Sequence, residues 1–170
     1  MNREIYPSDL SIYSFGPIAD AHSKLLILGS IPGKESLKMN FYYAHPQNAF
    51  WKIMFILYNQ SYSADNEFRK ELLLQNGIAL WDVIGNCKRE SSLDTDIRME
   101  NPNDLPAFLF THPGISKIFF NGKASAKYFN KYFPHISLDK KILPSTSPAH
   151  AIKWEKKLEA WREIKDIAQR

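Results

Sequence analysis

Four short apolar runs recur along the chain, and each of them ends abruptly in a polar loop. The runs are Leu25–Leu28, Ile78–Trp81, Ile118–Phe120 and Lys141–Leu143, and Gly, Pro, Ser, Asp or Asn residues follow them. Continuous apolar runs without polar alternation are typical of strands that are buried on both faces of a parallel sheet. We therefore predict parallel strands whose carboxyl ends present their loops at one edge of a sheet.

Segments with apolar residues at helical spacing lie between and after these runs. They are Asn48–Tyr58, Glu67–Gln75 with Ser63 as its expected N-cap, Asp104–Phe110, Lys123–Tyr132 and Ile152–Ala168. Alternation of strands and helices predicts an α/β fold with three layers, α/β/α, around a central four-stranded parallel sheet. We expect one domain over residues 1–170, with residues 1–23 as an N-terminal extension.

Composition narrows the class of protein. A chain of 170 residues is long enough for one substantial core, and its net charge of +4 permits a polyanionic partner without demonstrating one. The single Cys87 excludes an internal disulfide and a multi-cysteine metal site. No apolar run approaches the ~18 residues of a membrane span. We expect a cytoplasmic protein that binds no membrane, and no residue spacing indicates a metal or another cofactor.

The loops after the four runs carry side chains that suit ligand binding. Gly29–Gly33 combines two glycines with a serine, and backbone amides exposed in such a loop bind phosphate or carbonyl oxygens. Asp82 follows the second run, where it can accept a hydrogen bond from a ring N–H. Asn121 follows the third run, with Lys123 in the next helical turn, and Ser145–Ser147 follow the fourth between two prolines.

Each loop also has an ordinary structural interpretation, which the residues alone leave open. Gly29–Gly33 lacks the Gly-Lys-Ser/Thr order of a Walker A loop and fits a plain turn after a strand. Asp82 fits a loop cap, Asn121 fits a helix N-cap, and Ser145–Ser147 fit a cap for the last helix. A histidine such as His150 is more often structural or exposed than catalytic.

Taken together, the loops resemble the uracil-DNA glycosylase superfamily. Gly29–Gly33 reads Gly-Ser-Ile-Pro-Gly where the mismatch-specific branch carries Gly-Ile-Asn-Pro-Gly. Tyr43–Ile53 is similar to that branch's aromatic-Ala-His-Pro-x-Asn-x-Phe-Trp-Lys segment, and Leu143–His150 occupies the place of the second superfamily motif. With Ala-Leu-Trp-Asp-Val-Ile at Ala79–Ile84, the combination is most similar to the hypoxanthine-DNA (deoxyinosine) glycosylase family, and the likeness covers about residues 24–165.

The resemblance implies roles for individual residues. The mismatch-specific branch has a catalytic Asn in its first motif, a place that we assign to Ser30, and Ser145 replaces the usual His of the second motif. As in the hypoxanthine family, the main catalytic residue is then Asn48, with Ser30 and His150 as assisting candidates. The expected base pocket consists of Gly29, Ile31, Pro32, Gly33, Tyr42, Tyr43, His45, Asp82 and Asn121. The expected DNA-binding residues are Ser36, Lys38, Lys123, Ser145, Thr146, Ser147, Pro148 and Ala149.

The implied activity is that of a monofunctional DNA repair glycosylase. Such an enzyme flips a deaminated base, here hypoxanthine, out of DNA and hydrolyses its N-glycosidic bond to leave an abasic site. The implied partner is double-stranded or single-stranded DNA with a deaminated base, bound by a monomer without a cofactor. The alternatives are a uracil or thymine mismatch glycosylase, a non-catalytic nucleic-acid or nucleotide-binding protein on the same fold, and a hydrolase of small nucleosides.

Overall fold

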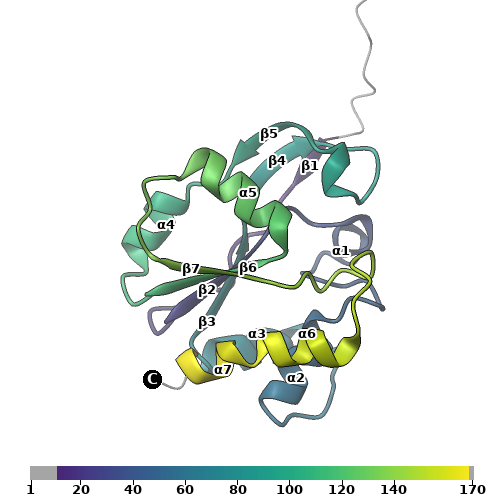
Figure 1. The fold of residues 1–170 in the computed structure, drawn as a ribbon, viewed down its shortest axis with the longest axis vertical. Coiled ribbons are helices and arrows are strands. Elements are labelled where there is room, and N and C mark those ends of the chain that lie inside the picture. Colours follow the sequence, from purple (N-terminus) through teal and green to yellow (C-terminus); the bar gives the residue numbers. More distant parts are fainter. Residues whose placement is uncertain (1–10, 169–170) are drawn as a thin grey trace, which may run out of the picture.

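A four-stranded parallel sheet forms the centre of the molecule. The computed structural model describes residues 11–168 of the chain. The sheet consists of β2 (Leu25–Gly29), β3 (Ile78–Asp82), β6 (Lys117–Asn121) and β7 (Asp139–Leu143), in the order β3-β2-β6-β7. Each strand contains one of the apolar runs, so the predicted central sheet is confirmed (Figure 1).

Helices cover both faces of this sheet, which confirms the three predicted layers (Figure 1). On one face lie α2 (Phe50–Leu57), α3 (Asn66–Gln75), α6 (Trp154–Trp161) and α7 (Glu163–Ala168). On the other face lie α4 (Leu105–Thr111) and α5 (Lys123–Tyr132), and the short α1 (Lys34–Met39) follows β2. Side chains of one strand alternate between the two cores, because Leu25 and Ile27 pack with the first set while Leu26 and Leu28 pack with the second.

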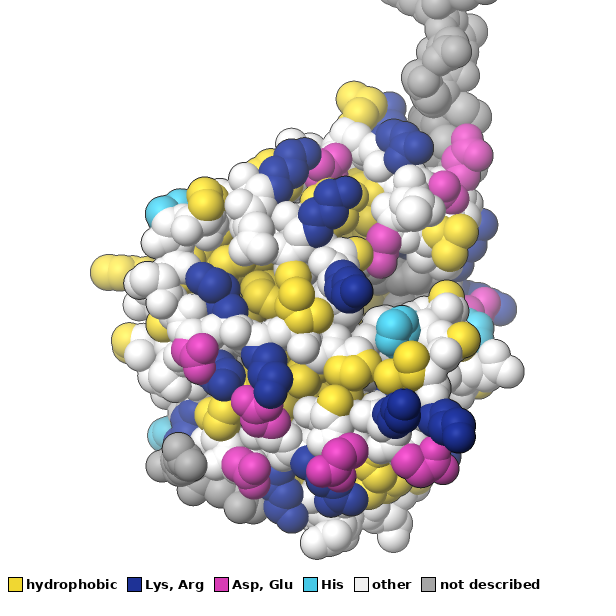
Figure 2. Space-filling model, viewed as in Figure 1, with side chains coloured by type: hydrophobic (Ala, Val, Ile, Leu, Met, Phe, Trp, Pro, Cys, Tyr) yellow, Lys and Arg dark blue, Asp and Glu magenta, His cyan; other side chains and the backbone are white. Residues whose placement is uncertain are grey.

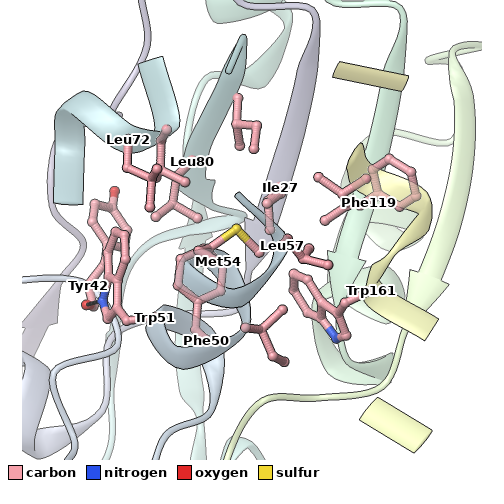
Figure 3. Close-up of a cluster of buried hydrophobic side chains, with 14 of the residues drawn as sticks. Ile27, Tyr42, Phe50, Trp51, Met54, Leu57, Leu72, Leu80, Phe119 and Trp161 are labelled. Carbon is pink, nitrogen blue, oxygen red and sulfur yellow. Dashed lines mark hydrogen bonds between the residues drawn. The ribbon is translucent and has the colours of Figure 1, made fainter. Parts of the chain in front are cut away.

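The larger core lies between the sheet and helices α2, α3, α6 and α7. Phe50 and Met54 of α2 lie there between Trp51, which is beside Tyr42, and Trp161 of α6, and Ile27 of the central strand belongs to the same cluster (Figure 3). These side chains are buried, and the indole N–H of Trp51 donates to the Tyr42 carbonyl at 2.8 Å. The aromatic residues at 50 and 51 therefore fix α2 and the segment that precedes it.

Two helical predictions need correction. The helix expected over 152–168 is two helices, because the backbone tightens around Arg162 into hydrogen bonds from Arg162 N–H to Glu159 and from Lys165 N–H to Arg162. The expected N-cap Ser63 is also wrong: Asp65 caps α3 by accepting from two backbone N–H groups. The Ser63 hydroxyl instead accepts from the Asp65 N–H.

A second sheet was not predicted. It is antiparallel, with the order β1-β4-β5, and consists of β1 (Ser11–Tyr13), β4 (Ile84–Lys88) and β5 (Arg98–Pro102). A 3-10 turn, Asp94–Asp96, lies between β4 and β5. β1 belongs to the segment expected as an N-terminal extension, of which residues 1–10 lie outside the described part.

The strand order places a crevice at the carboxyl edge of the central sheet. From β2 the chain moves to β3 on one side, and it later returns to β6 on the other side of β2. Helices on the two opposite faces make these crossovers, so the loops after β2 and β6 diverge. In open α/β sheets this reversal of direction is where ligands bind.

Candidate functional site

A cavity of about 480 Å3 opens at this carboxyl edge. It brings together the four strand ends that the sequence singled out: Asp82 from β3, Gly29 from β2, Asn121 from β6 and Ser145 after β7. The remaining lining residues are Ser30, Ile31, Pro32, Gly33, Lys34, Glu35, Ser36, Tyr42, Tyr43, His45, Asn48, Ser92, Leu93, Asp94, Thr146, Ser147, Pro148 and Ala149. A volume of this size is typical of sites for small molecules or single nucleobases, not for a duplex.

Asp82 is the buried acidic residue of the cavity. It ends β3 in register with Gly29 of β2, and 3% of its surface is exposed. Its Oδ2 atom has no hydrogen-bond partner among the described residues. The Asn103 side chain donates to the Asp82 carbonyl at 2.8 Å, so the backbone that carries the carboxyl group is held in place.

Burial shifts the titration of this carboxyl group. It raises the pKa of Asp82 from an ordinary value of 3.8 to about 7, and the Asp94 carboxylate acts in the same direction. The Arg89 guanidinium opposes both effects. A carboxyl group inside a cavity with a pKa near neutrality is a marker of functional sites.

Tyr43 reaches the same point from the segment before α2. Its hydroxyl group is buried, and burial followed by the charge of Asp82 raises its pKa above the usual range, while the Asn121 side chain acts in the opposite direction. Its backbone adopts φ 51°, a left-handed conformation that is uncommon outside glycine. The ring packs on Phe50 with the ring centres 4.3 Å apart. Strain of this kind persists where the surrounding packing imposes it, as it does at many functional sites.

Tyr42 is built into the core, although it also lines the cavity. Its hydroxyl donates to the Gly16 carbonyl at 2.7 Å, and its ring packs edge-on against Phe15. With 4% of its surface exposed, its ring has no free face for a base, so of the two tyrosines Tyr43 is the better candidate.

Asn48 lines the cavity from the segment just before α2. Its side-chain oxygen accepts a hydrogen bond from the Phe50 N–H at 3.0 Å, and its own N–H donates to the His45 carbonyl at 2.9 Å. Because the bond between the side-chain oxygen and the Phe50 N–H fixes the orientation of the amide, Asn48 presents a preorganised polar group to the cavity.

The loop after β7 is tied to the loop after β6 by a reciprocal pair of hydrogen bonds. Asn121 Nδ2 donates to the Thr146 hydroxyl at 2.8 Å, and the Thr146 N–H donates to Asn121 Oδ1 at 2.9 Å. Thr146 is fully buried and its carbonyl accepts from the Ala49 N–H, so its expected role as a DNA contact is replaced by a structural one. Gly122, not Asn121, is the N-cap of α5.

Two side chains of helix α6 donate hydrogen bonds to the backbone of the loop after β7. The Trp161 indole donates to the Pro144 carbonyl at 2.9 Å, and the Lys157 ammonium donates to the Ser147 carbonyl at 3.2 Å. Lys157 is 6% exposed, so its side chain is part of the packing that holds this loop. The tip of the loop, Pro148–His150, stays exposed.

The outer wall of the cavity was missed by the sequence analysis. It comes from the segment between β4 and β5, where the Ser92 hydroxyl accepts from the Lys34 N–H and Asp94 accepts from the Ser30 hydroxyl at 2.5 Å. Beneath it the buried Arg89 donates to the Pro32 carbonyl. A short run of serines and aspartates between two unpredicted strands gave no signal of this placement.

Three of the expected site residues do not line the cavity: Lys38, Lys123 and His150. Ser36 lines it but is 7% exposed, and its hydroxyl accepts from the Ala44 N–H at 3.2 Å, which is a structural contact. A position-by-position comparison with Gly-Ile-Asn-Pro-Gly also places Ile31, rather than Ser30, where that motif has its Asn. The Ile31 side chain is buried in an apolar cluster beside the second sheet, so it cannot orient water.

Lysines extend outward from the cavity edge along α5. Lys123, Lys127 and Lys131 are exposed and four residues apart, so they share one face of the helix. Figure 2 shows Lys and Arg side chains over the part of the surface that α5 forms in Figure 1, whereas side chains of both charges are mixed over α6 and α7. We call Lys123, Lys127 and Lys131 the α5 lysine row.

Residues 11–168 contain no group of three or more His, Cys, Asp or Glu side chains that could hold a metal ion. Within the same residues no helix has the length and apolar character needed to cross a membrane.

Comparison with known proteins defines the family of this site. The family model of the uracil DNA glycosylase superfamily matches residues 15–166, and the chain belongs to that superfamily. It is 34% identical over 150 residues to a hypoxanthine DNA glycosylase of Methanosarcina barkeri, a match covering 88% of this chain and 94% of the relative. It is 33% identical over 138 residues to a hypoxanthine DNA glycosylase of Methanosarcina acetivorans, covering 80% and 86%.

A solved structure shares the fold as well. The solution NMR structure of a candidate uracil DNA glycosylase from Methanosarcina acetivorans superimposes with a TM-score of 0.82 at 27% sequence identity. The match covers 94% of this chain and 99% of that one. The family and fold named from the sequence motifs are thus confirmed.

Proposed function

We propose that the protein is a monofunctional DNA N-glycosylase that removes hypoxanthine from DNA by hydrolysis of its N-glycosidic bond. Two relatives with that name match most of the chain, within a superfamily of DNA base-removing enzymes. The cavity has room for a base but not for a duplex, so the target nucleotide must leave the stack before it can react.

The observation that carries the proposal is the placement of the Asn48 amide in the same cavity as the buried Asp82 carboxyl group. In the proposed mechanism Asn48 orients the water that attacks C1′ of the flipped nucleotide. Tyr43 packs against the base, and Asp82 and the backbone of Gly29 contact its polar edge. Fixed dipoles of this kind stabilise the charge that develops as the bond breaks, by ~3 kcal/mol for one contact.

DNA binding is assigned to the rim of the cavity. Ser145 and Ser147 lie in the loop that α6 supports, and the α5 lysine row begins beside it. Hydroxyl groups, backbone N–H groups and lysines are the usual partners of phosphate oxygens, and they fix the register of the strand without reading its sequence.

Single-turnover excision decides the function. Duplexes and single strands that carry hypoxanthine, xanthine, uracil or thymine are incubated with excess enzyme, and release of hypoxanthine is expected to be the fastest. If uracil or thymine is released faster, the protein is a mismatch glycosylase instead. If it binds these substrates tightly and releases no base, it is a non-catalytic binding protein.

The variant Asn48→Ala tests the assigned catalytic group. Loss of its orienting contacts is expected to lower the excision rate by about 10²–10³-fold. Gln47→Ala is the matched control, because Gln47 is the exposed neighbour and does not line the cavity. Circular dichroism checks the fold, since the lost bond to the Phe50 N–H costs about 1 kcal/mol. An Asn48→Ala variant with the full excision rate would refute the role.

A further inference from the structure

We propose that the Asp82 carboxyl group is the general acid that protonates the purine base as it leaves. This inference rests on the proposed function and assigns the group that activates the leaving base.

The geometry of Asp82 points to a partner that the protein does not supply. Only 3% of the surface of Asp82 is exposed, although the residue lines the cavity. Its Oδ2 atom has no hydrogen-bond partner among the described residues. Buried polar atoms in native proteins are nearly always hydrogen-bonded, so an unsatisfied carboxyl oxygen inside a cavity indicates that a ligand completes it.

The surroundings of Asp82 favour its protonated form up to a pH of about 7. Burial is the main cause, Asp94 reinforces it from the outer wall, and Arg89 from beyond β4 opposes it. The phenols of Tyr42 and Tyr43 stay protonated because burial raises their pKa above the usual range. The pKa of Asp82, about 7, suits a group that must give up a proton at neutral pH.

Orientation of water and protonation of the base fall on different residues of the site. With Ile31 in the place of the catalytic Asn of the mismatch-specific motif, the first loop offers no amide there to position water. Orientation of water is assigned to Asn48, and a proton delivered to the leaving base is a separate contribution that is made in the transition state. Asp82 lies one strand away from this loop, paired with Gly29 at the end of β2.

The step conserves atoms and charge. The bond between C1′ and N9 breaks and its electron pair goes to the purine, while the Asp82 proton moves to an acceptor on the base. The oxygen atom of water bonds to C1′ and keeps one of its protons as a hydroxyl group, and the other proton passes to solvent. The Asp82 carboxylate then recovers a proton from solvent after the neutral base departs.

The test is the pH dependence of single-turnover hypoxanthine excision between pH 5.5 and 8.5. The rate of the unmodified protein is expected to fall as pH rises through about 7. Asp82→Asn keeps the shape and cannot supply a proton, so its rate is expected to be about 10²–10⁴-fold lower and independent of pH over that range. A merely structural role would lower the rate without removing its pH dependence.

Asp104→Asn is the matched control. That carboxylate caps α4 outside the cavity by accepting from the Ala107 N–H, so its replacement should leave the pH profile unchanged. Asp94→Asn removes a charge that raises the pKa of Asp82, so the fall in rate should move to lower pH.

The unmodified protein keeps the inference testable if Asp82→Asn does not fold. A rate that is flat, or that rises with pH, in a protein that does excise hypoxanthine overturns the role of Asp82 and leaves the proposed function standing. Absence of excision of any deaminated base refutes the proposed function instead.

Discussion

The Asp82 carboxyl group lies directly against the Cα atom of Gly29. A Cβ atom at position 29 would stand 2.5 Å from Asp82 Oδ1 and 2.8 Å from the Tyr43 hydroxyl oxygen. The glycine is therefore required by the close approach of the buried Asp82 carboxyl group and the Tyr43 hydroxyl. It lets the ends of β2 and β3 and the segment before α2 meet at one point of the cavity.

Gly29→Ala should disrupt this point of the cavity. The new methyl group has to displace the Asp82 side chain, which is buried, or the Tyr43 hydroxyl, which is a buried atom of a partly exposed residue. Overpacking of this kind costs about 1–3 kcal/mol of unfolding free energy. We expect that loss in urea unfolding, together with a reduced rate of hypoxanthine excision. Gly16→Ala is the control, because a Cβ at Gly16 meets nothing within 4 Å. Equal stability of the two variants would contradict the prediction.

The stability of the protein should depend on pH through Asp82. Its pKa is higher in the folded protein, about 7, than the ordinary value of 3.8 that it regains on unfolding. Between about pH 4 and pH 7 the folded state thus holds the proton that the unfolded state has released. Stability from this group is complete below pH 4 and is lost as pH rises to about 7.

A comparison with Asp82→Asn isolates this contribution. The pKa of Asp82 differs by about three units between the folded and the unfolded protein, which corresponds to about 4 kcal/mol of unfolding free energy. We expect urea unfolding to show the variant gaining stability relative to the unmodified protein as pH rises from 4 to 7, with no further change above 7. A constant difference over that range would show that Asp82 is not shifted in the folded state.

The reciprocal pair between Asn121 and Thr146 should stabilise the loop after β7. Thr146→Val keeps the shape of the side chain but leaves the Asn121 amide without its acceptor, which costs about 1–3 kcal/mol. Thr146→Ser keeps the hydroxyl group and is the matched comparison. Urea unfolding should rank Thr146→Val as the less stable variant, and the opposite order would mean that the lost methyl group matters more than the hydrogen bond.

Strands β2, β3 and β6 could be predicted because burial on both faces leaves an apolar run in each of them. Strand β7, at the edge of the sheet, exposes four of its five residues, and only its last residues gave an apolar signal. The second sheet lacks that signal, since β4 reads Ile-Gly-Asn-Cys-Lys and β5 reads Arg-Met-Glu-Asn-Pro. Their pairing also contains register shifts between Ile84 and Lys88. Half-exposed, polar strands held by distant partners are specified by tertiary contacts more than by local sequence.

The residues at the inner end of the cavity could be predicted from the order of apolar runs and loops, whereas the residues of its outer wall could not. Asp82 and Asn121 could be expected to meet because parallel strands end at one edge of a sheet. Ser92 and Asp94 reach the cavity only because the unpredicted β4 and β5 carry their segment back across the first loop. For Thr146 the sequence predicted a contact with phosphate that the structure does not support, because its hydroxyl group is fully buried against Asn121.

The α5 lysine row should make DNA binding sensitive to salt. Each lysine that neutralises a phosphate releases counterions, so the logarithm of the binding constant falls linearly with the logarithm of the salt concentration. Lys123→Ala, which removes the lysine at the cavity end of α5, should weaken binding to all sequences alike and reduce that slope by about 1. Lys140→Ala is the control, because Lys140 is exposed near the amino end of β7, away from the cavity edge. Fluorescence anisotropy over a salt titration measures both slopes. Equal slopes for Lys123→Ala, Lys140→Ala and the unmodified protein would remove Lys123 from the DNA-binding surface.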